Sequence, residues 1–201
     1  MPDPRRRSPL VDRRAAAAPD NALRLVEVPF VGKLVLQGDG DAVAEPVREA
    51  TGLALPREGG GTSGNDQVTI CWLGPEEWLL LCPPDGEGAL LESLGGALSG
   101  FPHQLVDATD QHTIIELVGP AARDTLAKLT TLDLHPRHFQ AGQVAGSLFG
   151  YVQATLLQTA ADDATGGPAF RLLVRWSQAD YLYELLLDAG REFGVAERGQ
   201  V

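Results

Sequence analysis

Residues 105–139 read LVDATDQHTIIELVGPAARDTLAKLTTLDLHPRHF, and this stretch decides the fold. Its apolar pattern predicts two strands, at 104–108 and 112–118, joined by a polar turn. Pro120 then begins a helix, because its fixed φ suits the first helical turn and no backbone hydrogen bond is lost there. One face of that helix is apolar, formed by Ala122, Leu126 and Leu129. The stretch is therefore a β-β-α unit.

The same kinds of element are predicted along the rest of the chain. Further strands are expected at 23–28, 31–36, 67–73, 78–82, 144–151, 152–158 and 170–176. Helices are expected at 41–51, 86–98, 120–130 and 178–189. The last of these has the spacing of a capping box, with Ser177 followed by Asp180, and it ends at Gly190.

A shift of the sequence by 80 residues places the segment from Leu25 over the segment from Leu105, and both follow one plan. Each has an acid-bearing first strand, a second strand, an amphipathic helix and a closing Leu-x-Pro or His-Pro. Identity between the two is low, so a chance match is the alternative. The order predicts an α+β protein with two pseudo-repeated ββαββα lobes, antiparallel sheets and helices packed on them.

The expected domain boundaries follow from these elements. They are a disordered basic arm at 1–22, an N-terminal α+β lobe at 23–102, a C-terminal α+β lobe at 103–195 and a tail at 196–201. Only Ser99-Gly100-Phe101-Pro102 separates the lobes, which predicts packed rather than tethered lobes.

Composition and charge narrow the class of protein. The 201 residues are 44% hydrophobic and 21% charged, as in a globular protein. Residues 1–22 carry five arginines and three aspartates, a charge of +2, which leaves −13 for the remainder of a chain whose total is −11. That acidity opposes binding to nucleic acid. No apolar run approaches the roughly 20 residues of a membrane span. We expect no nucleic-acid or membrane partner and a cytoplasmic location.

Motifs for catalysis, cofactors and metals do not stand out. Gly32-Lys33 lacks the other residues of a phosphate loop, and no GxGxxG follows a strand. Ser147 lacks the GxSxG elbow of a hydrolase. His135 and His138 flank Pro136, whose extended geometry need not bring the imidazoles together. The sequence therefore predicts no catalytic residue, no metal site and no cofactor bound by this chain.

Two groups of polar residues remain as candidates for binding. Asp107 and Asp110 follow a strand and would meet a cationic or amide-rich ligand, or form an Asx-turn with nearby backbone N–H groups, which we favour. Arg171 and Arg175 share one face of a strand. Together with Arg123 they would bind a carboxylate or phosphate. The favoured alternative for an acidic protein is that they form a row of salt bridges facing a partner. The candidates for binding a protein partner are His135, Arg137, His138, Arg171 and Arg175.

Several segments together resemble one protein family. They are Arg7-Ser8-Pro9-Leu10, WLGPEEWLLLCP from Trp72, DQHTIIELVGPAARDTLAK from Asp110, DLHPRHF from Asp133 and FRLLVRWSQADYL from Phe170. The chain resembles the gamma subunit of heterotetrameric sarcosine oxidase, within the folate-binding aminomethyltransferase-like superfamily. The resemblance covers most of the chain after the arm.

The resemblance implies a noncatalytic scaffold with alpha, beta and delta subunits as partners. It implies that those subunits carry FAD, FMN, NAD and zinc, and that the complex oxidises sarcosine to glycine. The alternative is a free-standing folate-binding aminomethyltransferase-like protein. In related aminomethyltransferases an aspartate of a comparable strand contacts the folate, which points to Asp107. The folate candidates of this chain are then Asp107, Asp110 and Arg123, with tetrahydrofolate as the ligand.

Overall fold

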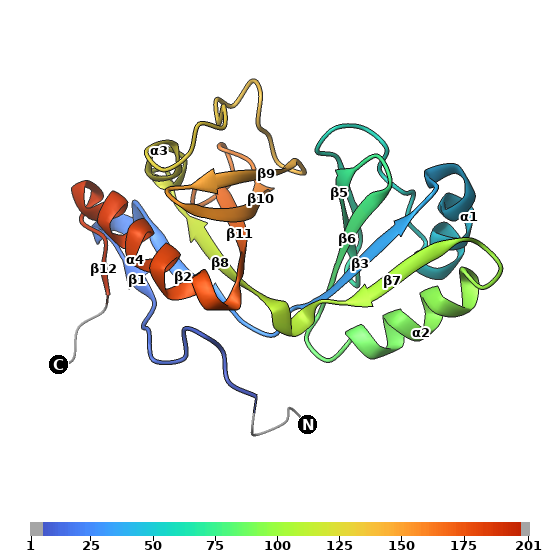
Figure 1. Cartoon of the computed structure of the whole chain (residues 1–201). Coiled ribbons are helices and arrows are strands. Elements are labelled where there is room, and N and C mark those ends of the chain that lie inside the picture. Colours follow the sequence, from blue (N-terminus) through green and yellow to red (C-terminus); the bar gives the residue numbers. More distant parts are fainter. Residues whose placement is uncertain (1–5, 198–201) are drawn as a thin grey trace. The chain divides into compact units, whose positions relative to one another are not determined.

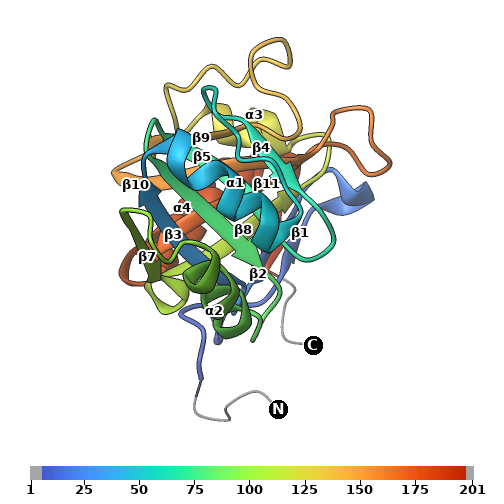
Figure 2. The same cartoon turned by 90° about the vertical axis from the view of Figure 1, so that its right-hand side faces the viewer.

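Two antiparallel sheets organise the chain in the computed structural model, which describes residues 6–197. Each sheet belongs to its own compact unit. One unit is Phe30–Gln111, and the other joins the described residues up to Pro29 with those from His112 onward. Figures 1 and 2 show that each sheet has helices packed against it.

The unit Phe30–Gln111 has five strands in the order β4-β5-β6-β3-β7. Its elements are β3 (Gly32–Gly38), α1 (Gly40–Thr51), β4 (Thr62–Gly64), β5 (Thr69–Gly74), β6 (Glu77–Cys82), α2 (Glu87–Ala97), β7 (His103–Asp107) and the 3₁₀ turn η2 (Thr109–Gln111). The helices and one sheet face enclose an apolar core that includes Leu34, Leu36, Val47, Ile70, Leu80 and Leu94. Trp78 is 1% exposed in that core and donates its indole N–H to the Pro56 carbonyl at 2.7 Å.

The other unit has seven strands in the order β12-β1-β2-β8-β11-β10-β9. Its strands are β1 (Ala16–Ala17), β2 (Arg24–Val28), β8 (His112–Val118), β9 (Val144–Phe149), β10 (Val152–Ala160), β11 (Ala169–Arg175) and β12 (Ala196–Glu197). Its helices are α3 (Ala122–Ala127) and α4 (Ala179–Gly190), with 3₁₀ turns η1 (Pro19–Asn21), η3 (Trp176–Gln178) and η4 (Arg191–Phe193). The core includes Leu25, Leu117, Leu126, Phe170, Leu172 and Leu186.

The expected fold class is confirmed in its coarse form, a mixture of helices and antiparallel sheets. Each of the nine expected strands and four expected helices has a counterpart within a few residues. The short strands β1, β4 and β12 were not expected. Their two or three residues are too few for a pattern of alternation to show in the sequence.

Sheet membership differs from the expected lobes 23–102 and 103–195. Strand β2 pairs with β8, as in Leu25↔Leu117, while β7 pairs with β3, as in Leu36↔Leu105. The first strand of each expected lobe therefore lies in the sheet built mainly by the other. Between the two strands the chain passes through Phe30, which has φ +63°, and β3 enters the second sheet instead of closing a hairpin with β2.

The described part of the expected arm, residues 6–22, is packed on its unit rather than disordered. Leu10 is 2% exposed, and β1 pairs with both β2 and β12. Arg13 forms ion pairs of 2.8 Å with Asp180 and 2.5 Å with Glu184, both on α4. An apolar anchor and carboxylates on α4 thus hold this segment. Residues 1–5 of the expected arm and 198–201 of the expected tail lie outside the described residues.

The two cysteines are free and buried. Burial raises the pKa of the Cys71 thiol to about 12 and, with help from the Glu87 and Asp107 carboxylates, that of Cys82 to about 11. Such thiols are poor nucleophiles at neutral pH. Among residues 6–197 we find no helix with the length and apolar character needed to span a bilayer.

Candidate functional site

Arg123, at the start of α3, donates five side-chain hydrogen bonds. Its Nε and Nη2 donate to the Asp162 carboxylate at 2.9 and 2.7 Å, and Nη2 also donates to Gln158 Oε1 at 3.1 Å. Its Nη1 donates to the carbonyls of Leu134 and, at 3.2 Å, Phe139. The side chain therefore joins α3, β10 and two loops.

These contacts use the whole donor capacity of the arginine. A guanidinium has five N–H groups, and Arg123 directs one from Nε and two from each terminal nitrogen to partners within the chain. The residue is 9% exposed, and its guanidinium carbon lies 5.1 Å from the centre of the Phe170 ring. The Arg123 hydrogen bonds also hold the pKa of Asp162 below its usual range. No donor is left for a folate or another anion.

The Arg123 contacts fix both ends of the loop 134–139. Leu134 and Phe139 are each 4% exposed and pack in the core, while their carbonyls accept from Arg123. The four residues between them, 135–138, are all exposed. The loop therefore presents a fixed row of polar side chains on a buried base.

Local hydrogen bonds complete the loop 134–139. Asp133 Oδ1 accepts from the backbone N–H of His135 at 3.0 Å, and His135 Nδ1 accepts from the N–H of Arg137 at 3.2 Å. The rings of His135 and His138 lie 6.3 Å apart at 63° to each other. Within the described residues no group of three or more His, Cys, Asp or Glu side chains is arranged to hold a metal ion.

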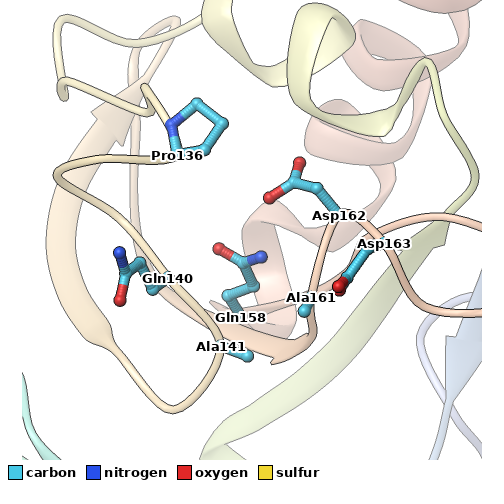
Figure 3. A pocket seen from close by; sticks show the side chains of 7 residues that line it. All are labelled: Pro136, Gln140, Ala141, Gln158, Ala161, Asp162 and Asp163. Atoms are coloured by element: carbon cyan, nitrogen blue, oxygen red, sulfur yellow. The ribbon is translucent and has the colours of Figure 1, made fainter.

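A shallow hollow of about 350 Å³ lies beside this loop. Figure 3 shows Pro136, Gln140, Ala141, Gln158, Ala161, Asp162 and Asp163 around it. Asp162 and Gln158 extend toward its middle. Both side chains are already bonded to Arg123, and Gln158 Nε2 donates to the Ala160 carbonyl at 3.0 Å. The two polar side chains that extend into the hollow are therefore already bonded within the protein.

The folate candidates do not form a ligand-ready set. Asp107 Oδ1 accepts from the backbone N–H of Thr109 at 2.9 Å, which is the Asx-turn that the sequence favours. Asp110 lies in η2 and is exposed. Arg123 directs all its donors to groups of its own unit. As observed, Arg123 does not fit a bound tetrahydrofolate.

The arginine row differs in part from expectation. Arg171 and Arg175 do share a face of β11, opposite Glu116 and His112 of β8. Arg171 is half-buried, and its Nε donates to Glu116 Oε1 at 3.0 Å, while Arg24 lies 3.5 Å from the second oxygen of Glu116. Arg175 is exposed. Arg171 thus belongs to an ion-pair network within its own sheet. Of the two arginines, Arg175 is the one whose side chain is exposed and open to a partner.

Sequence reasoning missed the residues that hold Arg123. Gln158 is fully buried within a strand and Asp162 follows that strand in a polar loop. Gln158 continues the face of β10 that is formed by the apolar residues Val152, Ala154 and Leu156. This was the available signal, because a polar side chain on such a face needs a polar partner.

Comparison with known proteins shows the family of the chain. The sequence model described as "Sarcosine oxidase, gamma subunit family" matches residues 15–192. The chain belongs to this family. It is 34% identical to the sarcosine oxidase subunit gamma of Corynebacterium sp. (strain U-96), over 96% of this chain and 93% of that one. The sarcosine oxidase subunit gamma of an Arthrobacter species is 31% identical, over 94% and 91% of the two chains.

Solved structures place the family in a wider fold group. A chain of the heterotetrameric sarcosine oxidase from Corynebacterium sp. U-96, in complex with pyrrole 2-carboxylate, superposes with a TM-score of 0.83 at 31% identity, covering 96% of this chain and 99% of that one. The glycine cleavage aminomethyltransferase T of Bartonella henselae superposes with a TM-score of 0.63 at 17% identity, covering 89% and 47%. The second likeness concerns the fold alone.

Proposed function

We propose that this chain is the noncatalytic gamma subunit of a heterotetrameric sarcosine oxidase, where it scaffolds the flavin-bearing subunits during oxidative demethylation of sarcosine to glycine. The observation that carries the proposal is the match, over 96% of this chain and 99% of the other, to a chain of such an oxidase. Its partners are the alpha, beta and delta subunits, which hold FAD, FMN, NAD and zinc. The complex is cytoplasmic.

The polar groups of this chain support a scaffolding role. The donors of Arg123 stabilise a loop, Asp107 stabilises a turn, and the cysteine thiols are buried. A scaffold needs fixed surface elements, and the loop 134–139 is one, so His135, Arg137 and His138 remain our candidates for partner contact.

The two halves of the chain are, we infer, related ββαββα repeats whose first strands are exchanged between the sheets. Support comes from the strand orders: β7-β3-β6-β5 and β2-β8-β11-β10 place corresponding elements in the same sequence across each sheet.

The test is to purify the chain alone and with the large subunits. Alone, it is expected to be colourless, to release no peroxide from sarcosine and to bind no tetrahydrofolate in equilibrium dialysis. Co-expressed, it is expected to copurify with the flavin-bearing chain through gel filtration. A flavin spectrum or peroxide release from the isolated chain contradicts the proposal. Tight tetrahydrofolate binding without capture of a large subunit supports the free-standing folate protein.

Charge reversal at Arg175 is expected to weaken capture of the large subunit several-fold and to change its salt dependence, as rim charges do. The melting temperature should stay nearly constant, because exposed substitutions usually cost under about 0.5 kcal/mol. Arg175→Glu is cleaner than Arg171→Glu, which would set a second carboxylate against Glu116. Arg48→Glu on α1 makes the same charge change elsewhere and is the control. Its partner Glu45 is 60% exposed, so solvent screens the new repulsion, whereas Glu116 is 15% exposed. Equal capture of both variants would remove Arg175 from the interface.

A further inference from the structure

Strand β7 forms one edge of the five-stranded sheet, and among the described strands only β3 pairs with it. Figure 1 shows β7 at the margin of this sheet, beside α2. Just after β7, the backbone N–H of Ala108 donates to the Lys33 carbonyl at 2.8 Å. Because paired and outward positions alternate along an antiparallel strand, the N–H and C=O of Leu105 point away from β3. An edge of this kind is a template for pairing with another strand.

The corresponding edge of the seven-stranded sheet is occupied. A row of apolar residues crosses each sheet: Leu25, Leu117 and Phe170 in one, and Leu105, Leu36 and Trp78 in the other. Strand β1 extends the first row, because its Ala16 lies opposite Leu25 and is fully buried. Beyond Leu105 the described residues provide no such strand. The β7 edge therefore lacks the neighbour that β1 supplies to β2.

The segment that carries β1 is also bound by a helix. Arg13, three residues before Ala16, forms ion pairs with Asp180 and Glu184 of α4. The backbone of the segment pairs with β2, and its arginine pairs with carboxylates on the neighbouring helix. An extended segment with an arginine shortly before a small residue is thus the kind of chain that fits this edge.

Helix α2 carries a matching carboxylate beside the β7 edge. A shift of 92 residues places buried residues of α2 on buried residues of α4, Leu90 on Leu182 and Leu94 on Leu186. The same shift places Glu92 on Glu184. Glu92 is exposed, and within the part of the chain that the structure describes it forms no ion pair. Its place on α2 is the one from which Glu184 binds Arg13.

The unit Phe30–Gln111 has no spare cation for Glu92. Between Arg57 and Arg123 the sequence holds ten Asp and Glu residues but no Lys or Arg. The cations of the unit are Lys33, which is buried, and Arg48 and Arg57, which form ion pairs with carboxylates of α1. The positive charge that complements Glu92 therefore has to come from the bound segment.

We propose that the β7 edge binds a basic, extended segment of another subunit of the oxidase as an added antiparallel strand, an inference that rests on the proposed function. The segment places a small residue opposite Leu105 and a Lys or Arg, three residues earlier, beside Glu92. Main-chain hydrogen bonds supply affinity in this mode of recognition, and side chains supply selectivity. The N-terminal segment of a second copy is not the occupant, because β1 already pairs with β2 of its own chain.

The first test measures capture of the full chain by the immobilised large subunits. Glu92→Lys is expected to weaken capture about tenfold or more, because the new cation repels the Lys or Arg of the bound segment. Glu49→Lys is the control, since it makes the same charge change at an exposed position of α1 in the same unit. Its neighbour Arg48 is 58% exposed, so solvent screens the added repulsion. Capture of this control should match that of the unchanged chain, and thermal melting verifies that both variants fold.

The second test is amide hydrogen exchange, which reports strand addition directly. In the isolated chain the outward N–H of Leu105 should exchange rapidly, whereas the N–H of Val106, directed to β3, should be protected. In the complex the Leu105 amide should exchange at least about tenfold more slowly, and Val106 should stay protected. Exchange is carried out in the complex, quenched and read for single residues by fragmentation in a mass spectrometer.

The outcomes separate the two proposals. Failure of the unchanged chain to be captured overturns the proposed function and this inference with it. Capture with the Leu105 amide exchanging as fast as in the isolated chain, or equal capture of Glu92→Lys and Glu49→Lys, overturns the inference and leaves the proposed function standing. Self-association of the isolated chain that protects Leu105 and that Glu92→Lys abolishes would make a second copy the occupant, which also overturns the inference.

Discussion

Replacing Arg123 with methionine is expected to lower the free energy of unfolding by about 3 kcal/mol, because buried acceptors left without a donor each cost about 1–3 kcal/mol. Methionine keeps much of the length of the side chain over Phe170 but has no N–H group. The carbonyls of Leu134 and Phe139 and the amide oxygen of Gln158 would lose their donor. Urea denaturation followed by tryptophan fluorescence measures the change.

The loop 134–139 supplies a second readout of Arg123→Met. With its two carbonyl anchors gone, the loop should open more often, and trypsin should cleave faster after Arg137, which is exposed in the middle of the loop. An unfolding free energy within about 0.5 kcal/mol of the unchanged protein, the usual range for surface changes, would show that Arg123 is not a structural anchor.

Asp162→Asn is the matched control for the charge of this network. Asp162 is 40% exposed, so water solvates its carboxylate and screens its ion pair with Arg123. We therefore expect Asp162→Asn to lower the free energy of unfolding less than Arg123→Met does. Arg123 lowers the pKa of Asp162 in the folded state, so the ionised carboxylate contributes stability above the unfolded pKa of about 3.9. That contribution is lost as the pH falls through the folded pKa. The stability difference between the two proteins should therefore shrink as the pH falls below about 4.

Local patterns predicted the elements of this chain well, because each element carries its own signal. Strand β8 has apolar residues on a buried face, and Gly119-Pro120 follows it, two residues before α3 begins at Ala122. Helix α1 has Asp39 as its N-cap, accepting from the N–H groups of Asp41 and Ala42, and ends at Gly52 with φ +73°. These signals lie within a few residues of the feature that they determine.

These local signals do not determine which strands share a sheet. Strand β2 has the apolar pattern of a hairpin partner for β3, from which it is separated by three residues, yet it pairs with β8. The choice depends on contacts about 90 residues apart, such as Leu25↔Leu117, which no local window contains. The packed segment 6–22 was missed for the same reason, since Arg13 finds its carboxylates on α4.

The candidate site shows the same limit. Sequence identified Arg123 and the loop 135–138 as separate polar features, one for a ligand and one for a partner. Structure joins them, because the carbonyls that accept from Arg123 are those of the residues flanking the loop. The Asx-turn at Asp107 was predictable, since its acceptor and donor are two residues apart.

Among the glycines that the structure describes, Gly119→Ala is expected to be the most damaging change to alanine, with a loss of about 3–4 kcal/mol from backbone strain and a steric clash. Gly119 has φ +134°, which a side chain rarely tolerates. A Cβ there would lie 2.4 Å from the Ala22 carbonyl oxygen and 2.9 Å from its carbon, and both are backbone atoms that cannot rotate away. The same Ala22 oxygen accepts from the N–H of Ala121 at 2.9 Å.

Because this contact fixes the residue that leads into β2 against the start of α3, Gly119→Ala should weaken the insertion of β2 beside β8. Gly146→Ala in β9 is the control, since its Cβ would meet no atom within 4 Å, and it should change stability by less than about 0.5 kcal/mol. Urea denaturation of both variants, with hydrogen exchange of the β2 amides, provides the measurement. Similar stabilities for the two variants would show that the Gly119 contact with Ala22 does not hold β2 in the sheet.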